Sequence, residues 1–328
     1  MRLETRFAVV GILLATLVAW PKAHAEEPYP NRAIRLVLPY PAGGSYDAIA
    51  RLIGKTLSDS LGQPIVIENR PGAAGEIGTT AAAEGAPDGY TIAFFGNSQT
   101  LLPSINPDLK YDIQKSFDPV ARVATVAEVI VVNPSVPVHS IAELISVARS
   151  KPGQLNFGSG GAGGITHLAG ELLKSIAHID IVHVPYKGQA PAVVGLLQGD
   201  VQILVLNVVS AIPQVKSGKA RALAVTSDSR SPFLPDVPTA IEAGLPGYEI
   251  VEWYGILVPK GTPPEIVAKL HTAISAALNR PDVAQALAKV GANPFPNDSP
   301  DAFRTFISQD IAKYATIIKH AGIRLNRQ

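Results

Sequence analysis

The sequence predicts an α/β protein of two lobes, joined by two crossing strands and separated by a cleft. Short β-rich runs alternate with longer helical patterns along most of the 328 residues. Such alternation is typical of parallel sheets that helices cover on both faces. Two apolar runs, residues 120–132 and 248–259, are longer than ordinary strands, and each separates one αβ block from the next. We therefore expect the chain to cross twice between the lobes.

The first 25 residues have the pattern of a secretory signal peptide. Arg2 and Arg6 precede an apolar stretch from Phe7 to Trp20, and an Ala-x-Ala cleavage site ends at Ala25. A transmembrane helix needs about 20 apolar residues, so a membrane anchor is the weaker interpretation of this stretch. We expect export to the periplasm and cleavage after Ala25, which leaves 303 residues (328 minus 25).

The composition of the remaining chain excludes several classes of partner. Removing the leader takes away three basic residues and one acidic residue, which leaves 25 basic (28 minus 3) and 26 acidic (27 minus 1) residues. Without long runs of like charge, neither nucleic acid nor an anionic membrane surface is an expected partner. The chain has no cysteine, so its stability must come from ordinary hydrophobic cores rather than disulfides. We expect a monomer.

The expected first lobe begins with a strand at residues 33–39, where Ile, Leu and Val dominate. A helix follows over residues 47–62, because its apolar residues recur at helical spacing and Gly62 ends the pattern. Two more strands are expected at residues 64–70 and 90–96, and a helix is expected between them at residues 79–86.

The same alternation resumes after residue 132. The expected strands are 155–160, 179–186, 201–207 and 220–227, and the expected helices are 140–150, 165–175 and 190–200. A proline-rich connection then leads to the second crossing run, and helices fill residues 263–328. We assign residues 26–125 and 250–328 to lobe I and residues 126–249 to lobe II.

The first glycine turn, residues 41–47, leaves a strand and enters a helix at once. Gly43 and Gly44 let a ligand approach the main chain closely. The helix start presents free N–H donors and the positive end of its dipole, which suit a carboxylate or phosphate. The alternative is a tight strand-to-helix connection that Ser45 or Asp47 caps, with no ligand. The turn alone leaves both interpretations open.

The second glycine turn, residues 158–164, has five glycines in seven positions, which exceeds what a helix cap needs. It also matches G-x-G-x-x-G, and Asp180 lies near the spacing of a ribose-binding acid. However, Asp180 begins its strand, whereas a dinucleotide-binding acid follows one. We therefore expect a second anion-receiving helix start. Two such turns on hinged lobes predict a clamshell that closes on a small anion.

Enzyme interpretations have less support. The nucleophile-elbow motif fails because Asp47 replaces its second glycine, and no histidine is marked as a partner. No H-x-x-x-H or H-E-x-x-H pattern occurs, so we expect no metal, no cofactor and no catalytic residue. An exported serine hydrolase that uses Ser45 or Ser159 remains the alternative.

A set of motifs in fixed order resembles the Bug family, the extracytoplasmic receptors of tripartite tricarboxylate transporters. The resemblance extends from Tyr29 to Leu325. The motifs are PYPAGGSYDAIAR, IENRPGAAGEIGT, APDGYT, HVPYKGQAPAVVGLLQGDV, ALAVTS, PDVPTAIEAGLPGYE and PKGTPPEIV. The resemblance implies a periplasmic-binding-protein fold that binds small carboxylates without catalysis. It also implies delivery to membrane transport subunits or, alternatively, to a signalling partner.

The resemblance places ligand contacts in both lobes, at the two glycine turns and in the segments near Asn97 and Tyr186. The expected ligand-binding residues are Tyr40, Ala42, Gly43, Gly44, Ser45, Asp47, Asn97, Ser98, Ser159, Gly160, Gly161, Ala162, Gly163, Thr166, His167, Tyr186 and Asn207.

The chain also departs from the family pattern. Leu206 stands where many members have an acidic residue before Asn207, which favours a plain or aromatic carboxylate over an amino acid as ligand. Tyr46 is bulkier than the small residue common at its position, so it bears on the size of the pocket. Trp253 and Tyr254 lie on a crossing strand, where they line the pocket or pack in the core.

Overall fold

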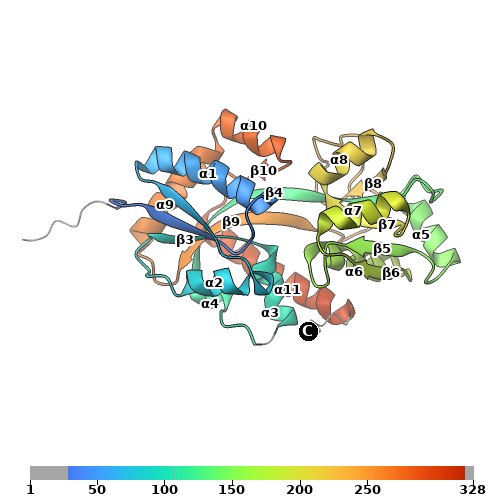
Figure 1. Cartoon of the computed structure of the whole chain (residues 1–328), viewed down its shortest axis with the longest axis horizontal. Coiled ribbons are helices and arrows are strands. Elements are labelled where there is room, and N and C mark those ends of the chain that lie inside the picture. The colour runs from blue at the N-terminus through green and yellow to red at the C-terminus, as the bar shows by residue number, and fades with distance from the viewer. Residues whose placement is uncertain (1–28, 107, 322–328) are drawn as a thin grey trace, which may run out of the picture.

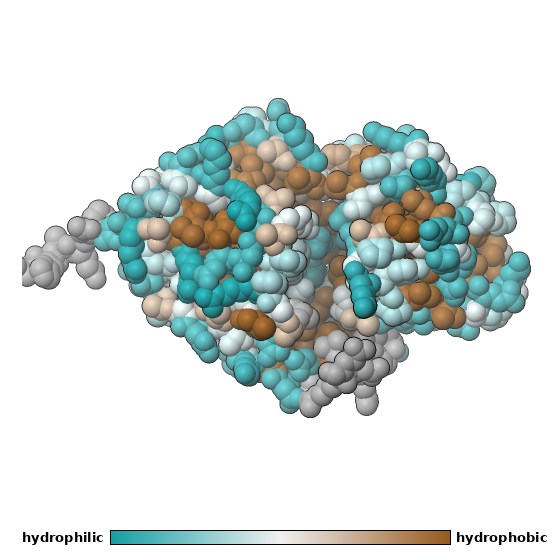
Figure 2. Space-filling model, in the orientation of Figure 1, coloured by the Kyte–Doolittle hydropathy of each residue, from teal (hydrophilic) through white to brown (hydrophobic). Residues whose placement is uncertain are grey.

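The computed structural model describes residues 29–106 and 108–321, so the expected signal peptide lies outside the described residues. These residues form two lobes that lie side by side (Figure 1), and Figure 2 shows the surface hollowed between them. Within the described ranges, no helix is long and apolar enough to cross a membrane.

A single twisted sheet runs through both lobes. In the described residues it contains ten strands in the order β2-β1-β3-β9-β4-β7-β5-β6, with β8 and β10 also paired to β4. The predicted α/β architecture of two lobes with crossing strands is therefore confirmed. The sheet is mixed rather than parallel, because β9 and β4 run antiparallel to their neighbours.

The first lobe contains the strands β1 (Ile34–Leu38), β2 (Ile65–Asn69), β3 (Thr91–Gly96), β9 (Val251–Pro259) and β10 (Asn293–Pro294). Its helical elements are α1 (Ser45–Leu61), η1 (Ala73–Gly75), α2 (Glu76–Ala83), α3 (Asn97–Ile105), α4 (Ile113–Ser116), α9 (Pro264–Leu278), α10 (Pro281–Lys289) and α11 (Pro300–Ala321). One sheet face packs on α1 and α9, and the other on α2 and α11. Helices therefore cover both faces of this part of the sheet and exclude water, which explains why its strands are apolar at consecutive positions.

The second lobe contains β5 (Asn156–Ser159), β6 (Val182–Pro185), β7 (Ile203–Asn207) and β8 (Arg221–Val225). Its helices are α5 (Ile141–Ser150), α6 (Ile165–Ala177), α7 (Gln189–Gln198) and α8 (Val208–Lys216). The helices α5 and α6 cover one face of the sheet, and α7 and α8 cover the other.

The strand β4 (Phe117–Val132) passes from one lobe to the other, and its partners change along its length. Residues 117–127 pair with β9, whereas residues 128–132 pair with β7 and β8. The chain before β9 makes the second crossing, because Tyr248 and Ile250 belong to the core of the second lobe. The Thr226 hydroxyl joins the two crossings: it accepts from the Glu128 N–H and donates to the Ile250 carbonyl.

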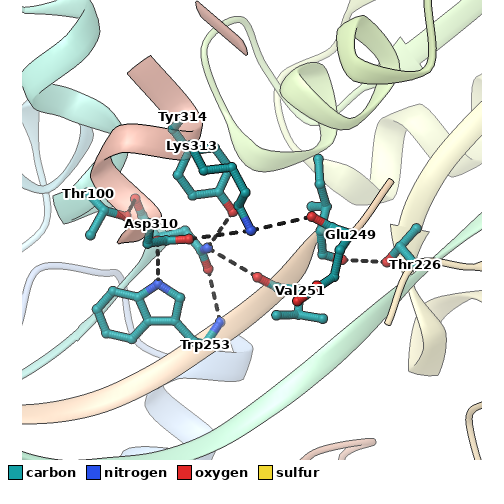
Figure 3. A network of polar contacts seen from close by, with 10 residues as sticks. Thr100, Thr226, Glu249, Val251, Trp253, Asp310, Lys313 and Tyr314 are labelled. Carbon is teal, nitrogen blue, oxygen red and sulfur yellow. Dashed lines mark hydrogen bonds and ion pairs between the residues drawn. The ribbon is translucent and has the colours of Figure 1, made fainter. Parts of the chain in front are cut away.

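A buried polar network fixes β9 against α3 and α11 (Figure 3). The Asp310 carboxylate accepts from the Thr100 hydroxyl at 2.7 Å and from the Trp253 indole N–H at 2.9 Å. The Asn97 amide donates to the Val251 carbonyl and the Tyr314 hydroxyl, and its oxygen accepts from the Trp253 N–H. The network therefore holds the lobe I end of the hinge rigid.

Candidate functional site

A cavity of about 220 Å³ lies between the lobes. Ser98, Leu101, Leu102 and Ile105 of α3 line one side, and residues 160–164 line the other. Ligand cavities of drug-sized molecules measure about 300–1,000 Å³, so this cavity suits a smaller molecule. The starts of α3 and α6 both lie at its wall, and each presents main-chain N–H groups there.

The first glycine turn lies outside this lining and is exposed along residues 41–45. Gly43 has φ +88°, a conformation that favours glycine, whereas Gly44 has φ −85°. Gly44 is the N-cap of α1, and no side chain caps the helix there. Among the described residues, the N–H groups of Gly44, Ser45 and Tyr46 have no recorded acceptor, so they are available to an anion.

Asp47 holds the shape of this turn. Its carboxylate accepts from the Gly43 N–H at 3.0 Å and from Arg51 at 2.9 Å, and the Asn69 amide donates to its second oxygen at 3.1 Å. The hydrogen bond from Arg51 is the largest cause that lowers the pKa of Asp47 to about 2. Because every neighbour is a donor, the carboxylate is fully engaged within the turn.

Tyr46 fills the space behind the first turn rather than the cavity. Its ring stacks on Tyr40 at a centroid distance of 3.7 Å and lies 4.5 Å from Tyr254. A Cβ at Gly96 would come within 2.1 Å of the Tyr46 hydroxyl, so this packing requires glycine there. The Tyr40 hydroxyl donates to Gln99 at 3.0 Å, which links the first turn to the start of α3.

Side chains of the second turn satisfy several of its own N–H groups. Gly160 donates to the Thr166 hydroxyl and Gly163 donates to His167 Nδ1, each at 3.0 Å. Gly161 donates to the buried Ser159 hydroxyl at 3.2 Å. The turn is therefore held in shape by the side chains of Thr166, His167 and Ser159, a role that the sequence pattern does not indicate. The N–H groups of Ala162 and Ile165 have no recorded acceptor among the described residues.

Two stacked histidines support the second turn. The rings of His167 and His183 lie 3.7 Å apart, and His183 Nε2 lies 2.7 Å from the Ser159 hydroxyl. Burial lowers the pKa of both imidazoles to about 4, so both are neutral at pH 7. His167 can then accept from Gly163. The contact between Ser159 and His183 has the length of a nucleophile–base pair, but the Ser159 side chain is 0% exposed and faces the interior of the turn.

Three predicted residues are engaged elsewhere. The Asn97 side chain holds β9 and Tyr314, and it is 2% exposed. Asn207 caps α8 by accepting from the Ser210 N–H. Tyr186 packs against Gly195, where a Cβ would come within 2.1 Å of its hydroxyl. All three side chains therefore have contacts within the protein, and their contact with a ligand stays a prediction.

Trp253 and Tyr254 belong to the core, since both are 0% exposed. The Trp253 ring packs edge-on against Phe303 and Phe306. The sequence pattern does not indicate the apolar wall that α3 contributes, which consists of Leu101, Leu102 and Ile105, because Pro103 obscures the helical periodicity.

Comparisons with known proteins agree with this architecture. The family model described as the tripartite tricarboxylate transporter family receptor matches residues 49–323. Protein BugT of Bordetella pertussis is 38% identical over 328 residues, covering 99% of this chain and 100% of BugT. Rpa4515 of R. palustris, solved with adipate, has a TM-score of 0.79 at 37% identity and covers 90% of this chain and 99% of its own.

A second solved structure, MatC of Rhodopseudomonas palustris with bound malate, has a TM-score of 0.75 at 34% identity. That match covers 88% of this chain and 100% of MatC. Both the sequence matches and the structural matches extend over nearly the whole chain. The protein is therefore a member of the Bug family of tripartite tricarboxylate transporter receptors.

Proposed function

We propose that this protein is a periplasmic receptor that binds a small organic carboxylate between its lobes and delivers it to the membrane subunits of a tripartite tricarboxylate transporter. The observation that carries the proposal is the cavity between α3 and residues 160–164, with helix starts at both walls. The relatives solved with adipate and malate support a carboxylate as ligand.

Binding in this cleft needs no covalent chemistry. Main-chain N–H groups at the starts of α1, α3 and α6 supply charge-assisted hydrogen bonds to a carboxylate. Closing the lobes excludes water, which strengthens these bonds by lowering the local dielectric constant. The ligand stabilises the closed arrangement only to the extent that it binds that arrangement more tightly than the open one.

The geometry narrows the proposed contacts to groups that are accessible. In lobe I these are the main-chain N–H groups of Gly44 and Ser45 and the side chain of Ser98. In lobe II they are the main-chain N–H groups of residues 160–165 that the turn itself leaves unpaired. We also propose that the chain passes between the lobes near residues 125 and 250.

We further propose that the leader is cleaved after Ala25. The intact mass of the protein isolated from the periplasmic fraction tests this cleavage site.

The decisive experiment identifies the bound molecule. Protein purified without refolding is examined by native mass spectrometry, and its thermal stability is then measured with a panel of organic acids. Each acid is paired with its amide, which has nearly the same shape without the charge. A ligand at 100 times its Kd stabilises the fold by about 2.7 kcal/mol. We expect at least one acid, but not its amide, to raise Tm without being consumed. A uniformly flat panel with no co-purified acid contradicts the proposal.

A further inference from the structure

The cavity between the lobes has a wall that carboxylate binding at the helix starts does not account for. On the α3 side its lining consists of Ser98, Leu101, Leu102 and Ile105. These positions are spaced i, i+3, i+4 and i+7, so the four side chains form one stripe along the helix. The stripe is polar at the start of α3 and aliphatic beyond it. A molecule whose carboxylate binds at the start of α3 therefore has aliphatic side chains beside its remaining atoms.

The two ends of this stripe also differ in electrostatic potential. At about 1.5 Å per residue, Ser98 and Ile105 are about 10 Å apart along the helix axis. The first N–H groups of α3 lie at the Ser98 end and carry the positive end of the helix dipole. The last carbonyl groups lie at the Ile105 end and carry the negative end. An anionic group is therefore favoured near Ser98 and disfavoured near Ile105.

The aliphatic part of the stripe is continuous with an apolar cluster that joins the two lobes. Leu101 is part of this cluster, together with Leu168 of α6 and Tyr314 and Ile317 of α11, and Ile105 packs against it. The helix α11 lies between α3 and α6 (Figure 1), and α6 belongs to the second lobe. An apolar group that binds beside Leu101 therefore extends a contact between the lobes, and the water it displaces favours their closed arrangement.

A second carboxylate would be costly at the same place. The described residues that line this cavity include no Lys, Arg or His side chain. A carboxylate beside Leu102 or Ile105 would lose its water shell without gaining a cation, whereas a methyl or methylene group there gains from burial.

We propose that the ligand of this receptor is a monocarboxylate with an apolar body, and that the α3 stripe selects it against dicarboxylates. The carboxylate binds at the starts of the helices, and Leu101, Leu102 and Ile105 contact the apolar body. Short-chain alkanoates and small aromatic monocarboxylates have this pattern. The inference rests on the proposed function and names the substrate class more closely.

The test compares acids of the same carbon skeleton that differ in whether the far end is a methyl group or a carboxylate. The pairs are butyrate with succinate, pentanoate with glutarate, hexanoate with adipate, and 4-methylbenzoate with terephthalate. Isothermal titration calorimetry at pH 7 measures each affinity, since the carboxyl groups are ionised there. Each methylene group that the stripe removes from water should tighten binding about fourfold until the cavity is filled.

Three variants test the role of the stripe. Ile105→Lys places a cation in the lining at the last residue of α3, where a cation also suits the helix dipole. Ser104→Lys is the matched control, because it adds the same charge at the adjacent position, which does not line the cavity. Ile105→Gln makes the same position polar without charge. Ile105 is only partly buried, and circular dichroism checks that each variant is folded.

We expect the wild type and Ser104→Lys to bind the monocarboxylate of at least one pair about tenfold or more tightly than its dicarboxylate. In Ile105→Lys the preference should fall below about threefold or reverse, because the dicarboxylate gains a partner. Ile105→Gln should weaken the monocarboxylate without strengthening the dicarboxylate, and it decides the matter if Ile105→Lys does not fold.

Three outcomes overturn this inference and leave the receptor function intact. The first is a wild type that binds acids but prefers the monocarboxylate in none of the pairs. The second is a preference that the Ile105 variants leave unchanged, and the third is an equal effect of Ser104→Lys and Ile105→Lys. If no member of any pair, and no acid of the wider panel, binds the wild type, both proposals fail.

Discussion

Asp47→Asn tests whether a charged side chain holds the first glycine turn. The carboxylate faces three donors, the Gly43 N–H, Arg51 and the Asn69 amide, and its side chain is only 7% exposed. In either orientation, the amide of asparagine places an NH₂ group against one of these donors. The substitution therefore removes the charge and also introduces a donor–donor conflict.

The expected magnitude follows from the pKa of Asp47. The pKa falls from 3.8 to about 2 in the fold, with the hydrogen bond from Arg51 as the largest cause. One pKa unit corresponds to about 1.4 kcal/mol, so the ionised carboxylate contributes about 2 kcal/mol at pH 7. Because the pKa is depressed, this contribution is complete above about pH 4 and is lost as the pH falls toward 2.

Urea unfolding followed by Trp253 fluorescence measures the effect, since this residue lies in the core of the same lobe. The control is Asp59→Asn on the same helix, whose ion pair with Lys55 is exposed and should contribute below about 0.5 kcal/mol. We expect Asp47→Asn to lower the unfolding free energy by about 2 kcal/mol at pH 7, with a smaller difference at pH 3. Equal losses in the two variants, or a difference that does not depend on pH, would refute this account of the turn.

Three further predictions concern binding, the hinge and pH. Gly44→Val should weaken carboxylate binding at least tenfold in calorimetry. The unfolding free energy should change by no more than about 1 kcal/mol, because a Cβ at this position meets nothing closer than 4.0 Å. Unchanged affinity would contradict the placement of the ligand at this turn. Asp310→Ala should lower the unfolding free energy by about 3 kcal/mol and shift the Trp253 emission to the red, because the Thr100 hydroxyl and the Trp253 indole N–H lose their acceptor. Unaltered emission would argue against the polar network around Asp310. The wild type should lose stability relative to His183→Asn by about 1–3 kcal/mol as the pH falls from 6.5 to 4, because burial lowers the pKa of the His183 imidazole to about 4 in the fold. Parallel pH profiles of the two proteins in urea unfolding would contradict this prediction.

The sequence predicted the crossing strands for a reason that the structure makes clear. Residues 117–132 form one strand that is buried in both lobes, so its apolar run is longer than that of a strand confined to one sheet. The glycine turns were also recognisable, because positive φ at Gly43, Gly161 and Gly163 is a local requirement. The expectation of a parallel sheet was wrong for β9 and β4, since strand direction depends on the connections between lobes.

The roles of individual site residues were harder to predict. Thr166 and His167 follow the second turn closely in sequence, and their proximity suggested ligand contacts. In the fold they accept from Gly160 and Gly163, so each helps to hold the turn, a role that proximity in sequence did not reveal. Local sequence shows which residues adjoin a turn but not which N–H groups the protein itself satisfies.

Local patterns in the chain were enough to determine the α/β class, the two glycine turns and the division into two lobes, because periodicity and glycine content act over a few residues. The arrangement of the site depended on long-range contacts. Asn97 is bound to Tyr314, 217 positions away, and Glu128 meets Asn207 and Glu252 only where the strands cross. Burial and hydrogen-bond partners are properties of the packed chain, so only the tertiary structure could show which polar groups are engaged and which remain available to a ligand.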